Sequence, residues 1–319
     1  MFRLAHISDV HLGAVPHLRL KDYISKRIVG YTNWRRNRAH AFTPETLQIL
    51  VDDMRAQNPD HIAVTGDLTN IARHEEFENA RLWLEDLGPP DLVTAIPGNH
   101  DAYVPGAHHR YRTAWAPWML NDDSEHVDKA LFPFMRRKRH IALIGISSAV
   151  ASVPFMATGR VGSDQTRRLV PLLEEARAEG RFRILLIHHP PKMILPDSGW
   201  RKLTDGRRFR DLIERHGAEL ILHGHEHVRS MTAIKGASGI VPVVGVPSGS
   251  GPATGGPKAG GYAIHEIVEN GACYDLTVIH RGYVEDGTIA ETARTSFSIN
   301  RPGPPLATSA APIPVVARA

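Results

Sequence analysis

Short apolar runs alternate with longer amphipathic stretches over the first 227 residues of the chain. The apolar runs are four to seven residues long, and several end in Gly, Asp, Asn or His, which is typical of buried strands. In the amphipathic stretches apolar residues recur every three or four positions, as in helices that pack one face on a core. The expected strands are 4–8, 61–65, 92–96, 141–147, 184–188 and 220–223, and the expected helices are 44–57, 75–87, 163–180 and 209–216.

After residue 227 the pattern changes to strands without helices. Strand–helix alternation followed by a strand-only region predicts a layered α/β domain that carries a second sheet. Residues 245–261 hold seven Gly and three Pro, which predicts a mobile loop. The Pro/Ala-rich residues 300–319 are predicted to form a disordered tail. The expected strands of this region are 229–235, 239–246, 262–269 and 273–281.

Composition places the 319-residue chain among ordinary globular proteins, because 42% of its residues are hydrophobic and 23% are charged. No apolar run approaches the roughly 18 residues of a membrane-spanning helix, and the N-terminus lacks a secretory pattern. The single cysteine excludes a disulfide framework and disfavours a cysteine-based metal site, which predicts a cytoplasmic protein. The 19 histidines can instead supply a metal site of imidazole and carboxylate ligands.

Polar side chains that bind metals follow five of the predicted strands, at the point where each strand ends. Because the carboxyl ends of strands in an open α/β sheet meet in one crevice, we expect these side chains to converge. Each block alone has the composition of an ordinary turn, but turns alone do not explain five such blocks that each directly follow a strand. Asp, Asn and His suit Mn, Fe or Zn, so the sequence predicts a transition-metal site. The blocks are Asp9-Val10-His11, Gly66-Asp67, Gly98-Asn99-His100-Asp101, His188-His189 and Gly224-His225-Glu226-His227.

In this order the blocks resemble those of the calcineurin-like metallophosphoesterases, over residues 9 to 227. The resemblance implies an α/β fold, a four-layer α/β/β/α sandwich of two mixed sheets flanked by helices, in a single domain over residues 1–299. It also implies two divalent or trivalent transition metal ions (Mn, Fe or Zn). By the same resemblance one ion is held by Asp9, His11 and His227, the other by Asn99, His188 and His225, and Asp67 bridges both.

The resemblance further assigns the reaction to a hydroxide that bridges the two ions and attacks phosphorus in line. His100, next to a ligand, is expected to stabilise the developing charge or to protonate the leaving oxygen. Asp101 is expected to orient His100 by accepting its other ring N–H. In the corresponding block of the family the ligand normally ends the strand, so the resemblance implies that His188 is the ligand, and we expect His189 to support that ligand or to face the substrate.

Details of the blocks narrow the comparison within this superfamily. The second block lacks both the arginine-containing extension of protein Ser/Thr phosphatases and the tyrosine ligand of purple acid phosphatases. The His6-Ile7-Ser8-Asp9 start and His188-His189-Pro190-Pro191 most resemble the class III cyclic-nucleotide phosphodiesterases and bacterial glycerophosphodiesterases. The predicted function is therefore a metal-dependent phosphoric diester hydrolase that acts on cyclic nucleotides or small phosphodiesters.

A basic, aromatic insertion at 17–42 separates the first two blocks, and its residues 21–38 hold six basic and one acidic side chain. They predict either a solvated helix that packs on the domain or a segment that contacts an anionic membrane at its inner face. Single-stranded nucleic acid is a third option. Membrane contact would favour an alternative function, a hydrolase of a lipid-linked pyrophosphate or phosphodiester, because a similar insertion occurs in the branch that cleaves UDP-diacylglucosamine.

A second insertion, at 103–139, is expected to cap the site. Arg110 and Trp115 are predicted to bind substrate, with Trp115 either stacking on a base, covering an acyl chain or packing inside the cap. Residues 136–139, all basic, are interpreted as a solvated charge run. The modest net charge of +4 argues against a nuclease, and the complete ligand set argues against a non-enzymatic role in partner binding.

Overall fold

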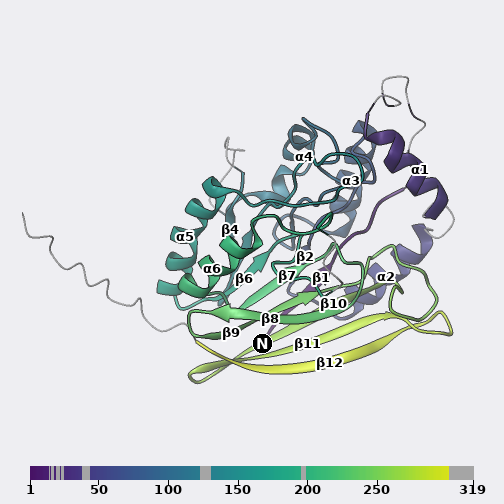
Figure 1. Ribbon diagram of the computed structural model, residues 1–319. Helices are drawn as coiled ribbons and strands as arrows, with labels where there is room; N and C mark the ends of the chain where they lie inside the picture. Colours follow the sequence, from purple (N-terminus) through teal and green to yellow (C-terminus); the bar gives the residue numbers. More distant parts are fainter. Residues whose placement is uncertain are drawn as a thin grey trace, which may run out of the picture.

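Two β-sheets of six strands each lie face to face at the centre of the molecule, with helices on the outside (Figure 1). The computed structural model describes residues 1–13, 15, 18, 22, 25–37, 44–122, 131–194 and 199–301 of the chain. Both sheets mix parallel and antiparallel strands. The prediction of two mixed sheets flanked by helices is confirmed.

The first sheet has the strand order β12-β11-β10-β1-β2-β3. Strands β1, β2 and β3 are parallel, whereas β10, β11 and β12 form an antiparallel meander beside β1. The carboxyl ends of the three parallel strands therefore share one edge of the sheet. The strands are β1 Phe2–Ile7, β2 His61–Val64, β3 Val93–Ala95, β10 Gly261–Asn270, β11 Cys273–Tyr283 and β12 Ile289–Asn300.

The second sheet has the strand order β4-β5-β6-β7-β9-β8. Strands β5, β6, β7 and β9 are parallel, and the antiparallel strands β4 and β8 form its two edges. Its strands are β4 Phe134–Lys138, β5 Ile141–Gly145, β6 Phe182–Leu186, β7 Leu220–His223, β8 Ser230–Gly236 and β9 Gly239–Gly245.

The helices begin where local sequence favours it. Helix α2 starts at Pro44, a residue suited to the first helical position because its missing N–H would have no partner there. Helix α3 starts after Arg73, whose backbone N–H donates to the Glu76 carboxylate at 2.8 Å. The helices are α1 Arg27–Asn37, α2 Pro44–Ala56, α3 His74–Leu87, α4 His108–Ala114, α5 Ser163–Ala178 and α6 Gly206–His216, with a short 3₁₀ helix at Ala116–Met119.

Side chains of the second sheet alternate between two apolar layers. Leu143 of β5 faces the first sheet and joins one large apolar cluster with it, whereas its neighbours Ala142 and Ile144 face helices α5 and α6. Because both faces are covered, the parallel strands are largely apolar, which is why their sequences predict strands so clearly. The sandwich therefore places the ends of parallel strands from both sheets at one side of the molecule.

Strand β4 corrects one expectation from the sequence. Residues 136–139 were expected to be solvated, but Arg136 is only 4% exposed. Its guanidinium donates to four backbone carbonyls, those of Pro90, Val93, Leu120 and Pro117, which lie at the start of β3, in the 3₁₀ helix and in the segments beside them. A buried guanidinium is tolerated here because its N–H groups have partners.

Several expectations concern segments that are described in part or not at all. The predicted disordered tail lies outside the described residues from residue 302 onward, and the same holds for parts of both predicted insertions. Within the predicted mobile loop at 245–261, Ser248 Oγ donates to the carbonyl of Asp9 and Gly249 N donates to that of Ser8. Among the described residues, no helix combines the length and the apolar character that crossing a membrane requires.

Candidate metal centre

The predicted metal-binding blocks come together where parallel strands of both sheets end. Three blocks follow β1, β2 and β3 of the first sheet, and two follow β6 and β7 of the second. A hydrogen bond joins the two sheets here, because the backbone N–H of His225 donates to Oδ2 of Asp9 at 3.0 Å. The candidate ligands brought to this place are Asp9, His11, Asp67, Asn99, His188, His225 and His227.

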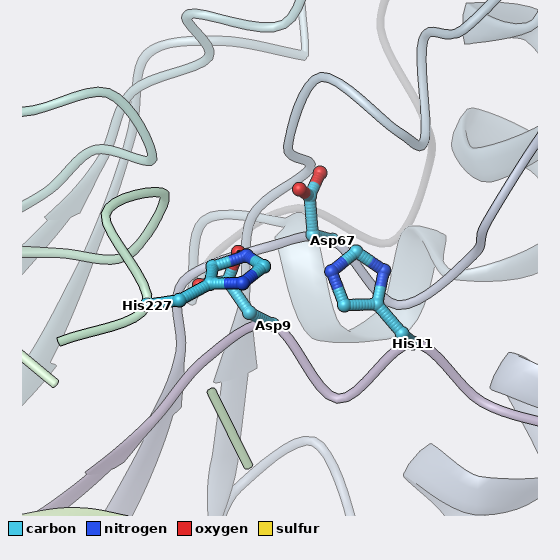
Figure 2. Close-up of side chains that lie close together, drawn as sticks. All are labelled: Asp9, His11, Asp67 and His227. Atoms are coloured by element: carbon cyan, nitrogen blue, oxygen red, sulfur yellow. The ribbon is translucent and has the colours of Figure 1, made fainter. Parts of the chain in front are cut away.

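Four of these residues form a compact cluster (Figure 2). One donor atom from each of Asp9, His11, Asp67 and His227 lies within 4.8 Å of the donor atoms of the others. Asp9 is fully buried, and its Oδ1 lies 2.8 Å from Nε2 of His227. The cluster thus holds two carboxylates and two imidazoles in a geometry that could hold one metal ion.

A second group of donors lies on the other side of Asp67. Nε2 of His188 is 3.3 Å from Oδ2 of Asp67 and 3.2 Å from Oδ1 of Asn99. The ring of His225 is close to the same place, with its centroid 5.2 Å from that of His188. Asp67 therefore lies between the two groups, as a bridging ligand would.

Three of the candidate histidines each donate one ring N–H to a backbone carbonyl. Because a carbonyl oxygen only accepts, the ring nitrogen that faces it carries a proton, and the other nitrogen is left as the possible ligand atom. This arrangement is the one that prepares a neutral imidazole for metal binding. The pairs are His11 Nδ1 with Thr69 O at 3.0 Å, His188 Nδ1 with Thr65 O at 2.8 Å and His225 Nε2 with Arg201 O at 2.8 Å.

Left-handed backbone turns position most of the candidate ligands. A positive φ is unfavourable for residues with a side chain and persists only where the surrounding structure enforces it. Here it lets the chain reverse sharply as it leaves a strand, so that side chains two residues apart face one cluster. The φ angles are 54° at Asp9, 42° at His11, 55° at Asp67, 70° at His225 and 56° at His227.

Two glycines of the blocks allow segments to approach each other. A Cβ at Gly98 would lie 2.2 Å from Oδ1 of Asp67, and a Cβ at Gly224 would lie 2.3 Å from Oδ2 of Asp9. Neither carboxylate could keep its place beside a larger residue. The glycines thus belong to the functional site, although sequence reasoning treated them only as part of the motif.

The two carboxylates of the cluster are kept ionised by the imidazoles around them. Burial alone would raise the pKa of Asp67, but the charge of His188 outweighs burial and holds this pKa well below its ordinary value. The pKa of Asp9 is likewise lowered by His227 against the effect of burial. Burial would lower the pKa of His188, and the charge of Asp67 instead raises it to about 9.

The donor set fits a pair of transition metal ions. Carboxylate oxygens, imidazole nitrogens and one amide oxygen are the hard-to-borderline ligands that Mn, Fe and Zn accept. Two buried carboxylates and several electron-pair donors face one another, an arrangement that is costly unless a cation or proton lies among them. The residues present are therefore suited to the metals that the sequence predicted.

Asp101 has a different place from the expected one. Its carboxylate accepts the backbone N–H groups of Asp67, Leu68, Thr69 and Gly98 and the hydroxyl of Thr69. Burial and the neighbouring charge of Asp67 raise the pKa of Asp101 to about 7, and the backbone donors oppose that shift. Asp101 thus holds together the loops that carry Asp67 and Asn99, whereas the expected contact was with the ring of His100.

The ring of His100 is oriented by a backbone carbonyl. Its Nδ1 lies against the carbonyl oxygen of Asn70, and its backbone N–H donates to Oδ1 of Asp67 at 2.7 Å. The ring packs edge-on against His11, with 4.8 Å between centroids. His100 is therefore beside the candidate metal centre, as expected, but a different residue fixes its orientation.

His189 is fully buried, and both of its ring nitrogens have partners within the protein. Its Nδ1 lies 2.8 Å from Oγ of Ser148, and its Nε2 lies 3.1 Å from the carbonyl oxygen of Ala157. Burial, together with the charge of His188, lowers the pKa of His189 to about 3. Its ring packs against that of His225 with 4.3 Å between centroids, so it supports a candidate ligand.

The full burial of Trp115 contradicts its predicted substrate contact, whereas the predicted contact of Arg110, which is only partly buried, stays a prediction. Trp115 is fully buried and donates its indole N–H to the carbonyl of Phe77 at 3.1 Å. Arg110 donates to the carbonyl of Ala72 at 2.6 Å. Both side chains hold the residues after Gly98-Asn99-His100-Asp101 against helix α3 and the loop before it, because an aromatic or guanidinium group near a core satisfies its N–H groups internally.

The basic insertion contributes to the domain through its described residues. Arg27 forms a buried ion pair with Asp22 at 3.0 Å and donates to the carbonyl of Ala72 at 2.7 Å. The rings of Tyr31 and Trp34 are partly buried against the apolar core. For these residues, packing on the domain accounts for the aromatic and basic pattern.

Lys26 and Tyr103 are site residues that sequence reasoning missed. The Lys26 ammonium lies 4.6 Å from the centroid of the Tyr103 ring, and that ring stacks on His100 with 5.5 Å between centroids. Lys26 was one of several basic residues in its segment, so the sequence offered no signal that singled it out. Tyr103 follows the third block by two positions, a spacing that could have marked it.

The family model described as calcineurin-like phosphoesterase matches residues 2–229 of the chain. The chain is 27% identical over 245 residues to glycerophosphodiester phosphodiesterase GpdQ of Enterobacter lignolyticus, and the match covers 74% of each chain. It is 26% identical over 227 residues to a "Probable cyclic nucleotide phosphodiesterase" of Synechococcus sp., covering 70% of this chain and 72% of the relative.

Among solved structures, a dimetal phosphatase from Danio rerio has a TM-score of 0.61 and 13% sequence identity, covering 94% of this chain and 98% of that one. A purple acid phosphatase from yellow lupin has a TM-score of 0.58 and 14% identity, covering 94% and 53%. At these identities the likeness shows the fold.

Proposed function

The chain belongs to the calcineurin-like phosphoesterase family, and we propose that it is a dinuclear, metal-dependent phosphodiesterase that hydrolyses cyclic nucleotides or other small phosphodiesters. The family and both curated relatives support a phosphoric diester hydrolase. The observation that carries the dinuclear proposal is the position of Asp67 between two groups of donors, with His188 and Asn99 on one side and the cluster of Figure 2 on the other.

In this proposal each group of donors holds one ion. When bound, the ions lower the pKa of a water molecule and neutralise charge on the phosphoryl oxygens. The hydrogen bonds from ring nitrogens to backbone carbonyls support these roles, because they fix which nitrogen of each ring is left to bind an ion. His188, whose pKa is raised to about 9 by Asp67, would release a proton when an ion binds. The proposed ligands are Asp9, His11 and His227 for one ion, Asn99, His188 and His225 for the other, and Asp67 for both.

His100 is the proposed residue that acts on the ester itself. Its ring is half-buried beside the ligands and is held by the Asn70 carbonyl, so an imidazolium here would donate toward the leaving oxygen or the charged phosphoryl oxygens. Asp101 contributes by fixing the backbone on which Asp67 and Asn99 are carried.

Metal content and turnover together test this proposal. We expect the purified protein, loaded with Mn, Fe or Zn, to hold two ions and to hydrolyse bis-p-nitrophenyl phosphate, cyclic nucleotides or glycerophosphodiesters in preference to monoesters. His188→Ala should lose one ion and most activity, whereas His74→Ala, a matched change of an exposed histidine on α3, should lose neither. Activity on monoesters alone, or full metal content in His188→Ala, would contradict the proposal.

The variant His100→Ala tests whether His100 acts on the ester without being a metal ligand. This variant should keep both ions and lose activity by roughly 100-fold or more, which is the usual contribution of a general acid. Nearly unchanged turnover with two bound ions would remove His100 from the mechanism.

A further inference from the structure

A cavity of about 560 Å³ lies beside the candidate metal centre, between helix α1 and the segment 155–157. Asn99 and His100 line it, so it is continuous with the site. When the phosphorus of a phosphodiester is at the metal centre, an organic group that its ester bonds carry, such as the nucleoside of a cyclic nucleotide, must extend away from it. The cavity is where such a group could be accommodated.

The walls of this cavity are mainly apolar. Helix α1 contributes Ile28 and Val29 together with the polar Thr32 and Asn33, and the facing segment contributes Phe155, Met156 and Ala157. Phe155 is 79% exposed, an unusual state for a phenylalanine ring. An exposed apolar ring that lines a cavity next to a reactive centre indicates a surface that is covered by a ligand.

Lys26 joins the two walls. Its ammonium donates to Oγ of Ser152 and to the carbonyl of Met156, each at 2.8 Å, and it lies over the ring of Tyr103. Tyr103 in turn stacks on His100. The charge of Lys26 is therefore engaged with the protein, and the residue fixes the segment 152–156 against helix α1 rather than adding a free charge to the cavity.

We propose that this cavity is the subsite for one ester group of the phosphodiester, and that it selects a large, predominantly apolar group over a small polar one. The inference rests on the proposed function. A glycerol-sized group would leave most of the volume to water and bury little of the apolar wall, whereas an aromatic ring or a hydrocarbon chain would bury much more. Lys26 is a positioning residue for this subsite.

Binding of simple phosphate monoesters tests the subsite independently of turnover. Methyl, phenyl and hexyl phosphate present the same phosphate with one ester group of increasing apolar size, and calorimetry with the metal-loaded protein measures their affinities. We expect phenyl or hexyl phosphate to bind about tenfold more tightly than methyl phosphate, because each buries additional apolar surface. Tighter binding of phenyl phosphate indicates an aromatic group such as a nucleobase, and tighter binding of hexyl phosphate indicates an acyl or alkyl chain.

Variants show whether the cavity is responsible. Phe155→Ala should lose most of this preference and keep the affinity for methyl phosphate, and its exposed side chain makes misfolding a minor concern. Leu82→Ala, which shortens an exposed apolar side chain on α3 outside the cavity, is the matched control and should change nothing. Lys26→Met should also reduce the preference without weakening methyl phosphate, whereas a merely structural role would weaken all three esters equally.

Two results would overturn the inference. One is equal affinity for the three esters, and the other is a preference that Phe155→Ala leaves intact. Failure of the proposed function is a separate outcome. It would appear as a protein that does not hydrolyse phosphodiesters or does not bind two ions, and the three affinities do not affect either result.

Discussion

Gly98 is so close to Asp67 that a single methyl group would displace the proposed bridging carboxylate. A Cβ there would lie 2.2 Å from Oδ1 of Asp67. We expect Gly98→Ala to lose metal and to reduce phosphodiester hydrolysis by roughly 100-fold, since a displacement of about 1 Å in a reacting group has such an effect. Metal analysis and steady-state kinetics check this. Gly199→Ala adds a methyl group where no atom lies within 4 Å, so an equal loss in both variants would contradict the explanation.

The second prediction concerns Asp101, and it is a loss of stability rather than a loss of metal. Its carboxylate accepts hydrogen bonds from backbone N–H groups of two loops. If an NH₂ group replaces one carboxylate oxygen, this hydrogen-bond donor faces backbone N–H groups, which are also donors. We expect Asp101→Asn to lower the free energy of unfolding by about 1–3 kcal/mol, the effect of leaving buried donors without acceptors. Denaturant unfolding measures it. A variant with unchanged stability and a selective loss of turnover would instead support the contact with His100 that the sequence suggested.

At the scale of single elements, the metal-binding blocks could be predicted because each directly follows a strand. The strands that precede the blocks, β1, β2, β3, β6 and β7, are almost completely buried, so their apolar runs mark both the strand and the point where it ends. The direction of a side chain could not be predicted in the same way. Trp115 follows the third block in sequence, but packing against helix α3 buries it.

Strand β4 shows why a basic run can conceal a strand. Arg136 is followed by the partly exposed Arg137 and Lys138, and its charge hides its buried position until its four carbonyl partners are known. These partners come from the loops around β3 and from the 3₁₀ helix, segments that are distant in the sequence. No local pattern of the chain could have indicated them.

The same contacts give a prediction for β4. Arg136→Met should lower the free energy of unfolding by about 2–4 kcal/mol, because several buried carbonyls lose a charged donor at once. Arg139→Met, at a side chain that is 62% exposed, should change it by no more than about 0.5 kcal/mol. Thermal or denaturant unfolding compares the two. Equal effects would show that Arg136 behaves as a surface residue, as its basic neighbours first suggested.

At the scale of the whole molecule, the two facing sheets enclose histidines that the proposed chemistry does not use. His265 and His280 are buried, and neither ring has a hydrogen-bond partner among the described residues. His6 lies 5.8 Å from His265 between ring centroids. Burial lowers the pKa of His265 to about 3 and that of His280 to about 4, in each case helped by a neighbouring positive charge. Both rings are therefore neutral in the folded protein at neutral pH.

Because of these lowered histidine pKa values, the free energy of unfolding of the protein decreases as the pH is lowered. In the unfolded chain a histidine takes up a proton below about pH 6.5, whereas the folded protein excludes that proton until the pH reaches the lowered values. The unfolded state thus binds more protons between these limits, and the free energy of unfolding falls as the pH is lowered. For each such histidine the slope approaches about 1.4 kcal/mol per pH unit between about pH 6 and pH 4.

His265→Leu should flatten this dependence without lowering stability at neutral pH. Leucine keeps the buried volume and removes a polar ring that lacks partners, so we expect the variant to be at least as stable as the wild type at pH 7.5. Between pH 6 and pH 4 it should lose about 1.4 kcal/mol less per unit than the wild type, measured by denaturant unfolding across that range. His74→Leu, at an exposed position on α3, should keep the wild-type slope. If His265→Leu also kept that slope, the titrating groups would have to lie elsewhere, and the buried histidines between the sheets would not determine how the fold responds to acid.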